Sequence, residues 1–241
     1  MRKFFLLIIF ITLFFATAIY VTFRWGSEWV STLVADIIPI EMQKQMGQSI
    51  ITSLEMQELQ PSSLSLFTQH KIRQNFFQVL GKDSTTIQLI FKNVSYPNAF
   101  ALPGNYIILL DSLVRMSKDT IHYTDITGVL AHEAGHLHYK HSLKLMIKSG
   151  ITAAVIGYFI GDISAFVATL THQLLSLSYS RDYEREADDY AIRVLQNHHI
   201  STIPLAELLE TMSNSTSDVP EFLSTHPITK ERVERLKGKN L

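Results

Sequence analysis

The pentapeptide His132-Glu133-Ala134-Gly135-His136 lies inside a segment of helical periodicity that we expect to run from residue 124 to about residue 148. A helix advances about 100° per residue, so the two histidines lie about 40° apart and one turn from each other. Two imidazoles placed in this way can bind one zinc ion. Glu133 lies beside the open coordination position, where it would activate a zinc-bound water. The pattern predicts a catalytic zinc site carried by a helix.

Residues 180–188 provide the best candidate for the third protein ligand, which a catalytic zinc ion needs besides an open fourth position. Glu184 and Asp188 are four residues apart and share one helix face, and Arg181 lies close by. Alone, the segment also fits a charged amphipathic helix, but beside the first motif we expect Glu184 to complete a His₂Glu site. Asp188 would accept the free ring N–H of a zinc-bound histidine and so fix its tautomer.

His138 and His141 follow the pentapeptide closely, but we do not expect them to bind the metal. On one continuous helix they point about 180–240° away from His132. We interpret both as surface or structural histidines.

The composition excludes several classes of protein. A length of 241 residues suits one compact domain, or one domain plus an anchor. With 21 Lys+Arg, 22 Asp+Glu and a net charge of −1, the chain lacks the basic surplus of a nucleic-acid-binding protein. The absence of cysteine excludes a disulfide scaffold, a cysteine-type zinc finger and a thiol nucleophile. An apolar fraction of 46% and a mean hydropathy of +0.13 indicate that part of the chain contacts a membrane.

Residues 4–23 carry no charge and follow Arg2 and Lys3. About 20 apolar residues can cross a bilayer as a helix, and the basic end should stay in the cytoplasm. We therefore expect residues 1–24 to anchor the chain in the cytoplasmic membrane, with residues 25–241 as a metallopeptidase domain on the extracytoplasmic, periplasmic side. Residues 16–18, Ala-Thr-Ala, leave open a cleaved signal peptide, which would export the rest of the chain equally.

Between residues 149 and 180 the only charged side chain is that of Asp162. A single crossing here would separate His132 from Glu184 by a bilayer, and two crossings need about 20 residues each. We therefore expect residues 149–179 to form an apolar helical hairpin beside the active site, in contact with lipid, with deeper insertion as the alternative.

Periodicity and turn residues divide the rest of the chain into helices and a few strands. In the first helix, Met42, Met46, Ile50 and Leu54 form the expected buried stripe, and Ser62 or Ser63 should cap the second helix, which Gly81 ends. The expected helices are residues 41–54, 62–80, 111–117, 124–148, 180–198, 204–213 and 229–237, and the expected strands are 85–91, 98–102 and 106–110. This order indicates an α+β fold.

With these motifs in place, the chain resembles the HtpX-like and CAAX-prenyl-protease group of zinc metalloendopeptidases, within the gluzincins, and its envelope-anchored BepA-like subgroup. The resemblance covers about residues 96–232. It is carried by HEAGH at 132–136, SRDYEREAD at 180–188, NAFALPG at 98–104, and Thr225-His226-Pro227 with Arg232. Asn105 stands where the family has a second glycine, which is a mild departure.

The resemblance implies a mainly helical zincin-type domain with a small sheet beside the active-site helix. His226 would lie near the metal and donate to the developing oxyanion, unless it is only a turn histidine before proline. Arg232 would brace that turn. A sheet edge beside the cleft would pair with extended substrate, unless it is an ordinary strand. The residues of this edge would be Asn98, Ala99, Phe100 and Ala101.

Two hypotheses follow from these observations. The first is a zinc-dependent metalloendopeptidase with one Zn²⁺ per chain, which hydrolyses peptide bonds of misfolded or membrane-associated proteins. Its partners would be protein or peptide substrates and membrane lipid, and not nucleic acid. The alternative is a chaperone-like, membrane-associated zinc protein with weak or no proteolysis. The intact Glu133 argues against the alternative, because a purely structural zinc site does not need that carboxylate.

Overall fold

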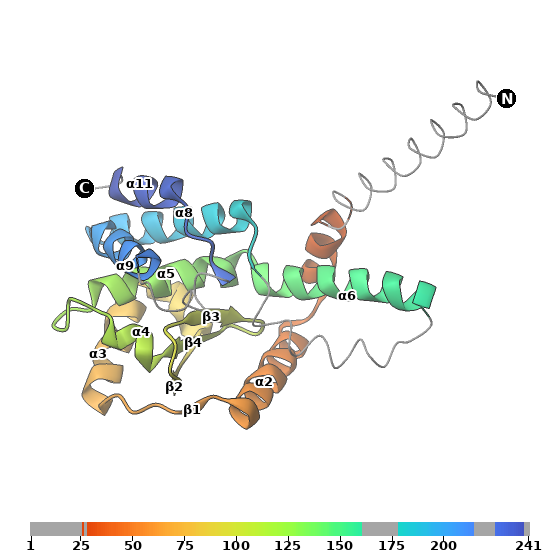
Figure 1. The fold of residues 1–241 in the computed structure, drawn as a ribbon, viewed down its shortest axis with the longest axis horizontal. Helices are drawn as coiled ribbons and strands as arrows, with labels where there is room; N and C mark the ends of the chain where they lie inside the picture. The colour runs from red at the N-terminus through yellow and green to blue at the C-terminus, as the bar shows by residue number, and fades with distance from the viewer. Residues whose placement is uncertain (1–25, 27, 161–177, 215–224, 239–241) are drawn as a thin grey trace, which may run out of the picture.

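A computed structural model describes residues 26, 28–160, 178–214 and 225–238, without the side chains of residues 82–84 and 151–160. Helices surround a four-stranded sheet, which confirms the α+β prediction (Figure 1). The elements are α2 (Ile40–Gln57), β1 (Gln60–Pro61), α3 (Leu66–Leu80), the 3₁₀ helix η1 (Gly81–Thr86), β2 (Gln88–Asn93), β3 (Ala99–Leu102), β4 (Tyr106–Leu110), α4 (Asp111–Arg115), α5 (Thr124–His138), α6 (His141–Ile160), α8 (Arg181–Asn197), α9 (Ile203–Ser213) and α11 (Lys230–Gly238).

The sheet has the order β1-β2-β4-β3, so β3 forms one edge. β2 and β4 are parallel, whereas β1 pairs with β2 and β3 pairs with β4 in antiparallel fashion. The strands predicted at residues 98–102 and 106–110 are confirmed. β2 begins later than predicted, because η1 occupies the residues that precede it.

The central strand β4 separates two apolar clusters, because successive side chains of a strand point to opposite faces. Ile107 and Leu109 belong to the main core, which α3, α5, α9 and α11 complete. Ile108 and Leu110 belong to a second cluster, into which α2 inserts Ile50, Ile51 and Leu54. The sheet is therefore covered on both faces, and α5 and α2 lie on opposite sides of it (Figure 1).

α5 lies between the sheet and α8, and Figure 1 shows the two helices side by side. Their close approach depends on Gly135. A Cβ atom at this position would lie 2.8 Å from Cα of Ala187 in α8, closer than packed side chains allow. A glycine inside the first motif thus lets the second motif pack directly against it.

The prediction of one helix over residues 124–148 is wrong. α5 ends at His138, and α6 begins at His141. Lys140 between them has a φ of 56°, in the left-handed region that ends helices. The break turns His141 back toward the pentapeptide, so the angle that we expected on a continuous helix does not apply.

Two further expectations about helices need correction. The buried stripe of α2 consists of Gln43, Gly47, Ile50, Ile51 and Leu54, whereas Met42 is exposed. Gly47 is required there because a Cβ atom would clash with the carbonyl oxygen of Pro103. Ser65 caps α3 instead of the predicted serines. Ser62 and Ser63 bind the carboxylate of Asp111.

The predicted anchor, residues 1–24, and the second arm of the predicted hairpin lie outside the described residues. α6 continues without interruption through residue 149, where we expected the first arm to begin. Within residues 28–160, 178–214 and 225–238, no helix combines the length and the apolar character that a membrane crossing needs.

Candidate metal centre

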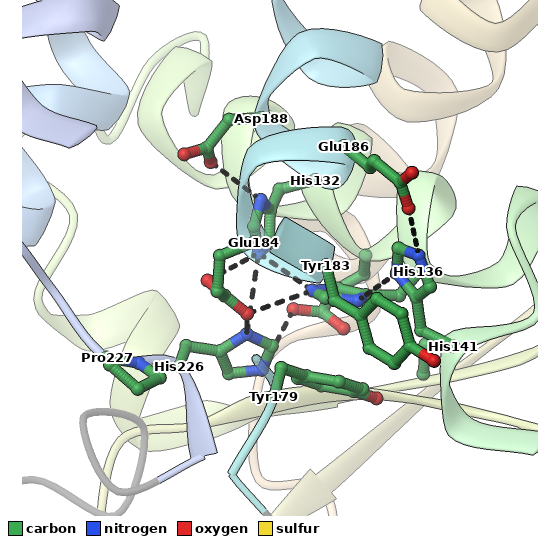
Figure 2. Close-up of polar contacts among 12 residues, drawn as sticks. His132, His136, His141, Tyr179, Tyr183, Glu184, Glu186, Asp188, His226 and Pro227 are labelled. Carbon is green, nitrogen blue, oxygen red and sulfur yellow. Dashed lines mark hydrogen bonds and ion pairs between the residues drawn. The ribbon is translucent and has the colours of Figure 1, made fainter. Parts of the chain in front are cut away.

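Four buried side chains converge between α5 and α8: His132 and His136 from α5, Glu184 from α8, and His226 from the segment before α11 (Figure 2). Their ligand atoms all lie within 4.8 Å of one another. The Nε2 atoms of the two α5 histidines are 3.1 Å apart, and that of His136 is 3.3 Å from Oε1 of Glu184. Imidazole nitrogens and a carboxylate oxygen are a donor set that zinc prefers. The cluster fits one such ion.

The other ring nitrogen of His132 faces α8. Its Nδ1 atom lies 2.9 Å from Oδ1 of Asp188, one turn after Glu184. Asp188 also accepts hydrogen bonds of 2.8 and 2.9 Å from Nε and Nη2 of Arg232. This contact keeps the Asp188 carboxylate beside Nδ1 of His132 and leaves Nε2 to face the cluster.

Arg232 joins three parts of the site. Its guanidinium forms ion pairs with Asp188 and Glu184 and donates to the carbonyl oxygen of Pro227 at 3.1 Å. It therefore connects the turn after His226 to α8. Arg181, by contrast, is exposed at the first residue of α8, and no ion pair connects it to the described residues of the cluster.

The buried carboxylates stay ionised despite their burial. Burial by itself would raise the pKa of Glu184, but the positive charges of His226 and Arg232 outweigh it and hold that pKa well below its usual value. Burial would also raise the pKa of Asp188, yet the contacts with His132 and Arg232 lower it to about 2. Burial lowers the pKa of His136 well below its usual value. The cluster thus combines anionic carboxylates with a neutral imidazole, the form that binds metals.

Glu133 lies on α5 beside the cluster and is fully buried. Its donor among the described residues is the backbone N–H of Ala101 in β3, and this contact falls short of normal hydrogen-bond geometry. Nε2 of His226 is 3.5 Å from Oε1 of Glu133. Burial raises the pKa of Glu133, although the charges of His226 and His132 oppose this change. A carboxylate with a raised pKa is a better proton acceptor near neutral pH.

His141 is the main residue of the site whose role the sequence did not reveal. It is fully buried, and its Nδ1 atom lies 2.9 Å from Nδ1 of His136, while its Nε2 atom lies 2.9 Å from Oε2 of Glu186 (Figure 2). Its ring stacks on Tyr183 at a centroid distance of 4.1 Å. The chain His136–His141–Glu186 therefore orients the second α5 histidine, as Asp188 orients the first.

Tyr179 is a second residue of the site that the motifs did not indicate. Its ring stacks on His136 at a centroid distance of 3.9 Å, and its hydroxyl group lies 2.9 Å from Oγ of Ser142. Its only signal in the sequence was its place directly before Ser180, the N-cap of α8. His138, by contrast, is exposed, in agreement with its interpretation as a surface histidine.

The predicted substrate strand is β3, the sheet edge that contacts α5. Asn98 directly precedes it, and all four of its residues are buried. The carbonyl oxygen of Asn98 accepts from the Leu110 N–H, so the backbone groups of Asn98 and Phe100 face β4. Backbone groups alternate along a strand, which directs those of Ala99 and Ala101 away from the sheet.

Comparison with known proteins places these motifs in a family. The sequence profile described as Peptidase family M48 matches residues 70–240, more than half of the chain. The chain belongs to peptidase family M48. The matched part of this M48 chain begins after α2. It includes α5 and α8, which carry three of the four clustered side chains, and also His226 and Arg232.

Relatives with curated names agree with this assignment. Metalloprotease YcaL of Escherichia coli strain K12 is 27% identical over 157 residues, which cover 59% of this chain and 58% of the relative. Protease HtpX of Legionella pneumophila strain Corby is 26% identical, covering 77% of this chain and 80% of the relative. Mitochondrial metalloendopeptidase OMA1 of Saccharomyces cerevisiae is 26% identical, covering 62% and 45%. The M48 chain thus spans less than two thirds of YcaL and OMA1.

Proposed function

We propose that this M48 chain is a zinc-dependent metalloendopeptidase. The observation that carries the proposal is the buried convergence of His132, His136 and Glu184 next to the buried carboxylate of Glu133. Family membership supports it, and so do relatives that are named metalloprotease and metalloendopeptidase. The alternative, a chaperone-like zinc protein, gives no reason for a carboxylate whose pKa burial raises beside the metal ligands.

His132, His136 and Glu184 would hold one zinc ion. Bound there, zinc supplies a Lewis acid that polarises the carbonyl group of the scissile peptide. Asp188 and His141 fix the orientations of the two imidazole rings through their 2.9 Å contacts. Both rings therefore keep a set position while substrate binds.

Glu133 serves as the general base. Its buried carboxylate accepts a proton from the attacking water and then returns it to the amine that leaves. The raised pKa makes Glu133 a base strong enough for the first transfer and an acid strong enough for the second. A glutamine at this position has the same shape but cannot carry the proton.

His226 donates to the oxygen of the scissile carbonyl as negative charge develops on it. The charges of Glu133 and Glu184 raise the pKa of His226 against the effect of burial, so its ring remains a donor. Its Nδ1 atom lies 3.0 Å from Oε1 of Glu184, within the cluster itself. The ring must therefore turn away from Glu184 to admit the peptide, because a catalytic site keeps one coordination position open.

Extended substrate pairs with β3, along the groups of Ala99 and Ala101 that point away from the sheet. The N–H of Ala99 and the carbonyl oxygen of Ala101 already bind Oδ1 of Asn98 and Oγ of Ser142. The carbonyl oxygen of Ala99 points the same way and would accept a hydrogen bond from substrate. The N–H of Ala101 faces the carboxylate of Glu133 and would reach substrate only when that contact opens. Asn98 thus positions the strand through its side chain. The side chain of Phe100 points to the face of β3 that α2 covers.

Residues 25–241 form the catalytic domain, and residues 1–24 anchor it in the cytoplasmic membrane with the active site on the periplasmic side. The uncharged run of residues 4–23 behind two basic residues supports this placement. The apolar residues 149–179 add contact with lipid. Such a location suits substrates that are misfolded or membrane-associated proteins, as in the envelope-anchored BepA-like subgroup.

Cleavage of unfolded casein by the purified full-length chain, with and without a chelator, tests the proposal. We expect cleavage that the chelator abolishes and that zinc restores. Casein that stays intact at one zinc ion per chain would refute the peptidase and favour the chaperone-like alternative.

A further inference from the structure

An apolar pocket opens beside the metal centre, on the α2 side of β3. Its walls come from α2, β3 and α6, and Tyr179, Thr225 and His226 line it where it adjoins the cluster. Because His226 belongs to both, the pocket directly adjoins the metal centre. The larger apolar side chains of its walls include Ile50, Leu54, Phe100, Leu102, Leu145 and Met146.

The pocket offers no charge to a ligand apart from His226. Among the residues that the structure describes, its lining contains no lysine, arginine, aspartate or glutamate side chain. Two of its polar groups, Asn98 and Ser142, already hold backbone groups of β3. Burial of a methylene group in such surroundings stabilises a complex, whereas an unpaired charge costs far more than it gains. The chemistry therefore suits a large uncharged apolar side chain.

The register of β3 explains how a substrate would reach this pocket. Phe100 points into the cluster that contains Ile50 and Leu54, while Ala99 points into the core on the α5 side. A peptide that continues the sheet past β3 alternates its side chains between the same two sides. Every second substrate side chain thus enters the α2 side, and the one nearest His226 meets the pocket.

α2 contributes the wall that the family match leaves out, since that match begins at residue 70. Gly47 lets α2 lie against the turn at Pro103, and Ile50 and Leu54 follow it on the same helix face. Met146 closes the opposite side from α6 and is only partly buried. One wall of the pocket is therefore set by an element outside the matched region.

We infer that this pocket, between α2 and α6, selects a large apolar side chain, of the size of leucine, methionine or phenylalanine, next to the scissile bond. This inference rests on the proposed peptidase function and deepens it. It makes α2 a determinant of specificity, with Met146 as the residue that sets the depth of the pocket.

The test uses the full-length chain and peptides that differ only at the preferred position found by mapping cleavage sites in casein. For the native chain we expect kcat/KM to be about 10-fold or more higher for leucine than for alanine. Met146→Trp fills the pocket and should reduce this ratio to less than about 2-fold. Met146→Ala deepens it and should shift the preference from leucine toward phenylalanine. Met56→Trp, the same substitution at an exposed position of α2, should change nothing.

Binding of the same labelled peptides to the Glu133→Gln chain is measured by fluorescence anisotropy. This measurement separates the claim about the pocket from the claim of peptidase activity. A leucine preference in binding that Met146→Trp removes supports the pocket, even if no peptide is cleaved and the peptidase proposal fails. Equal binding and equal cleavage of the leucine and alanine peptides by the native chain would overturn the pocket. A ratio that Met146→Trp and Met146→Ala both leave unchanged would overturn it as well.

Discussion

Oδ1 of Asp188 lies 2.9 Å from Nδ1 of His132, and both side chains are buried. The two residues come from different helices, and Gly135 permits the approach that brings them together. The contact connects the second motif to the first through a histidine whose opposite nitrogen faces the metal cluster. Arg232 completes the arrangement by neutralising Asp188 from the far side.

Asp188→Asn should weaken zinc binding by about 10- to 100-fold, because the ring of His132 loses its anionic partner. The dissociation constant is measured by competition with a chromogenic chelator. Asp189→Asn is the matched control, since Asp189 is the next residue, is exposed and pairs only with Arg235 among the described contacts. Equal zinc affinities of the two variants would contradict the role of Asp188.

His141→Phe should weaken zinc binding by about 10-fold, because His136 loses the contact that orients its ring. Phenylalanine can keep the stacking on Tyr183, so the fold should survive. The measurement is again chelator competition, and His138→Phe, at the exposed last residue of α5, should bind zinc like the native chain. A native affinity in His141→Phe would show that the link to Glu186 has no influence on the metal.

His226→Phe should lower kcat by about 10²- to 10³-fold while zinc content stays at one ion per chain, because the developing oxyanion loses a donor. Steady-state kinetics on a fluorogenic peptide and metal analysis of the same sample measure both quantities. An unchanged or higher kcat would show that the ring only occupies the cluster and does not donate during the reaction.

The loop before α5 provides a prediction about pH. Asp119 accepts hydrogen bonds from the N–H groups of His122 and Thr124 and from the Thr124 hydroxyl group, at the start of the helix that carries the pentapeptide. Burial would raise its pKa, but these bonds lower it to about 2. A carboxyl group with a lowered folded-state pKa stabilises the fold above its unfolded pKa of about 3.9, and this stabilisation is lost as the pH falls toward 2.

Asp119→Asn should therefore reduce the free energy of unfolding by about 1 kcal/mol at pH 7, a value that allows for solvent screening of a partly exposed group. The difference from the native chain should shrink between about pH 4 and pH 2. Urea unfolding at several pH values measures it, with Asp182→Asn, at an exposed position, as the control. A difference that stays constant down to pH 3 would contradict the account.

Local patterns were sufficient to predict the strands 98–102 and 106–110, the helix that carries Glu184, and the general α+β architecture. These features depend on periodicity, turn residues and capping residues, such as Ser180 before α8. The contact of Asp188 with His132 was also foreseeable, because helical spacing places Asp188 one turn after Glu184.

What remained hidden depends on contacts between distant residues. Ser62 and Ser63 look like helix caps, but Asp111 binds them from 49 and 48 residues away. Lys140 ends α5 in a left-handed conformation without a glycine or proline to signal it, and so the position of His141 could not be predicted. Gln43 and Gly47, not Met42, face the core because α2 must approach the turn at Pro103.

Substitution of Glu133 by glutamine tests the central claim most directly, because it removes the proposed base and keeps the shape of the side chain. Casein cleavage and zinc content are measured on the same preparation, with Glu207→Gln, at an exposed position of α9, as the control. The account predicts one zinc ion per chain in all three proteins and a loss of cleavage of at least about 10²-fold in Glu133→Gln alone. Cleavage at the native rate by a zinc-loaded Glu133→Gln chain would contradict it.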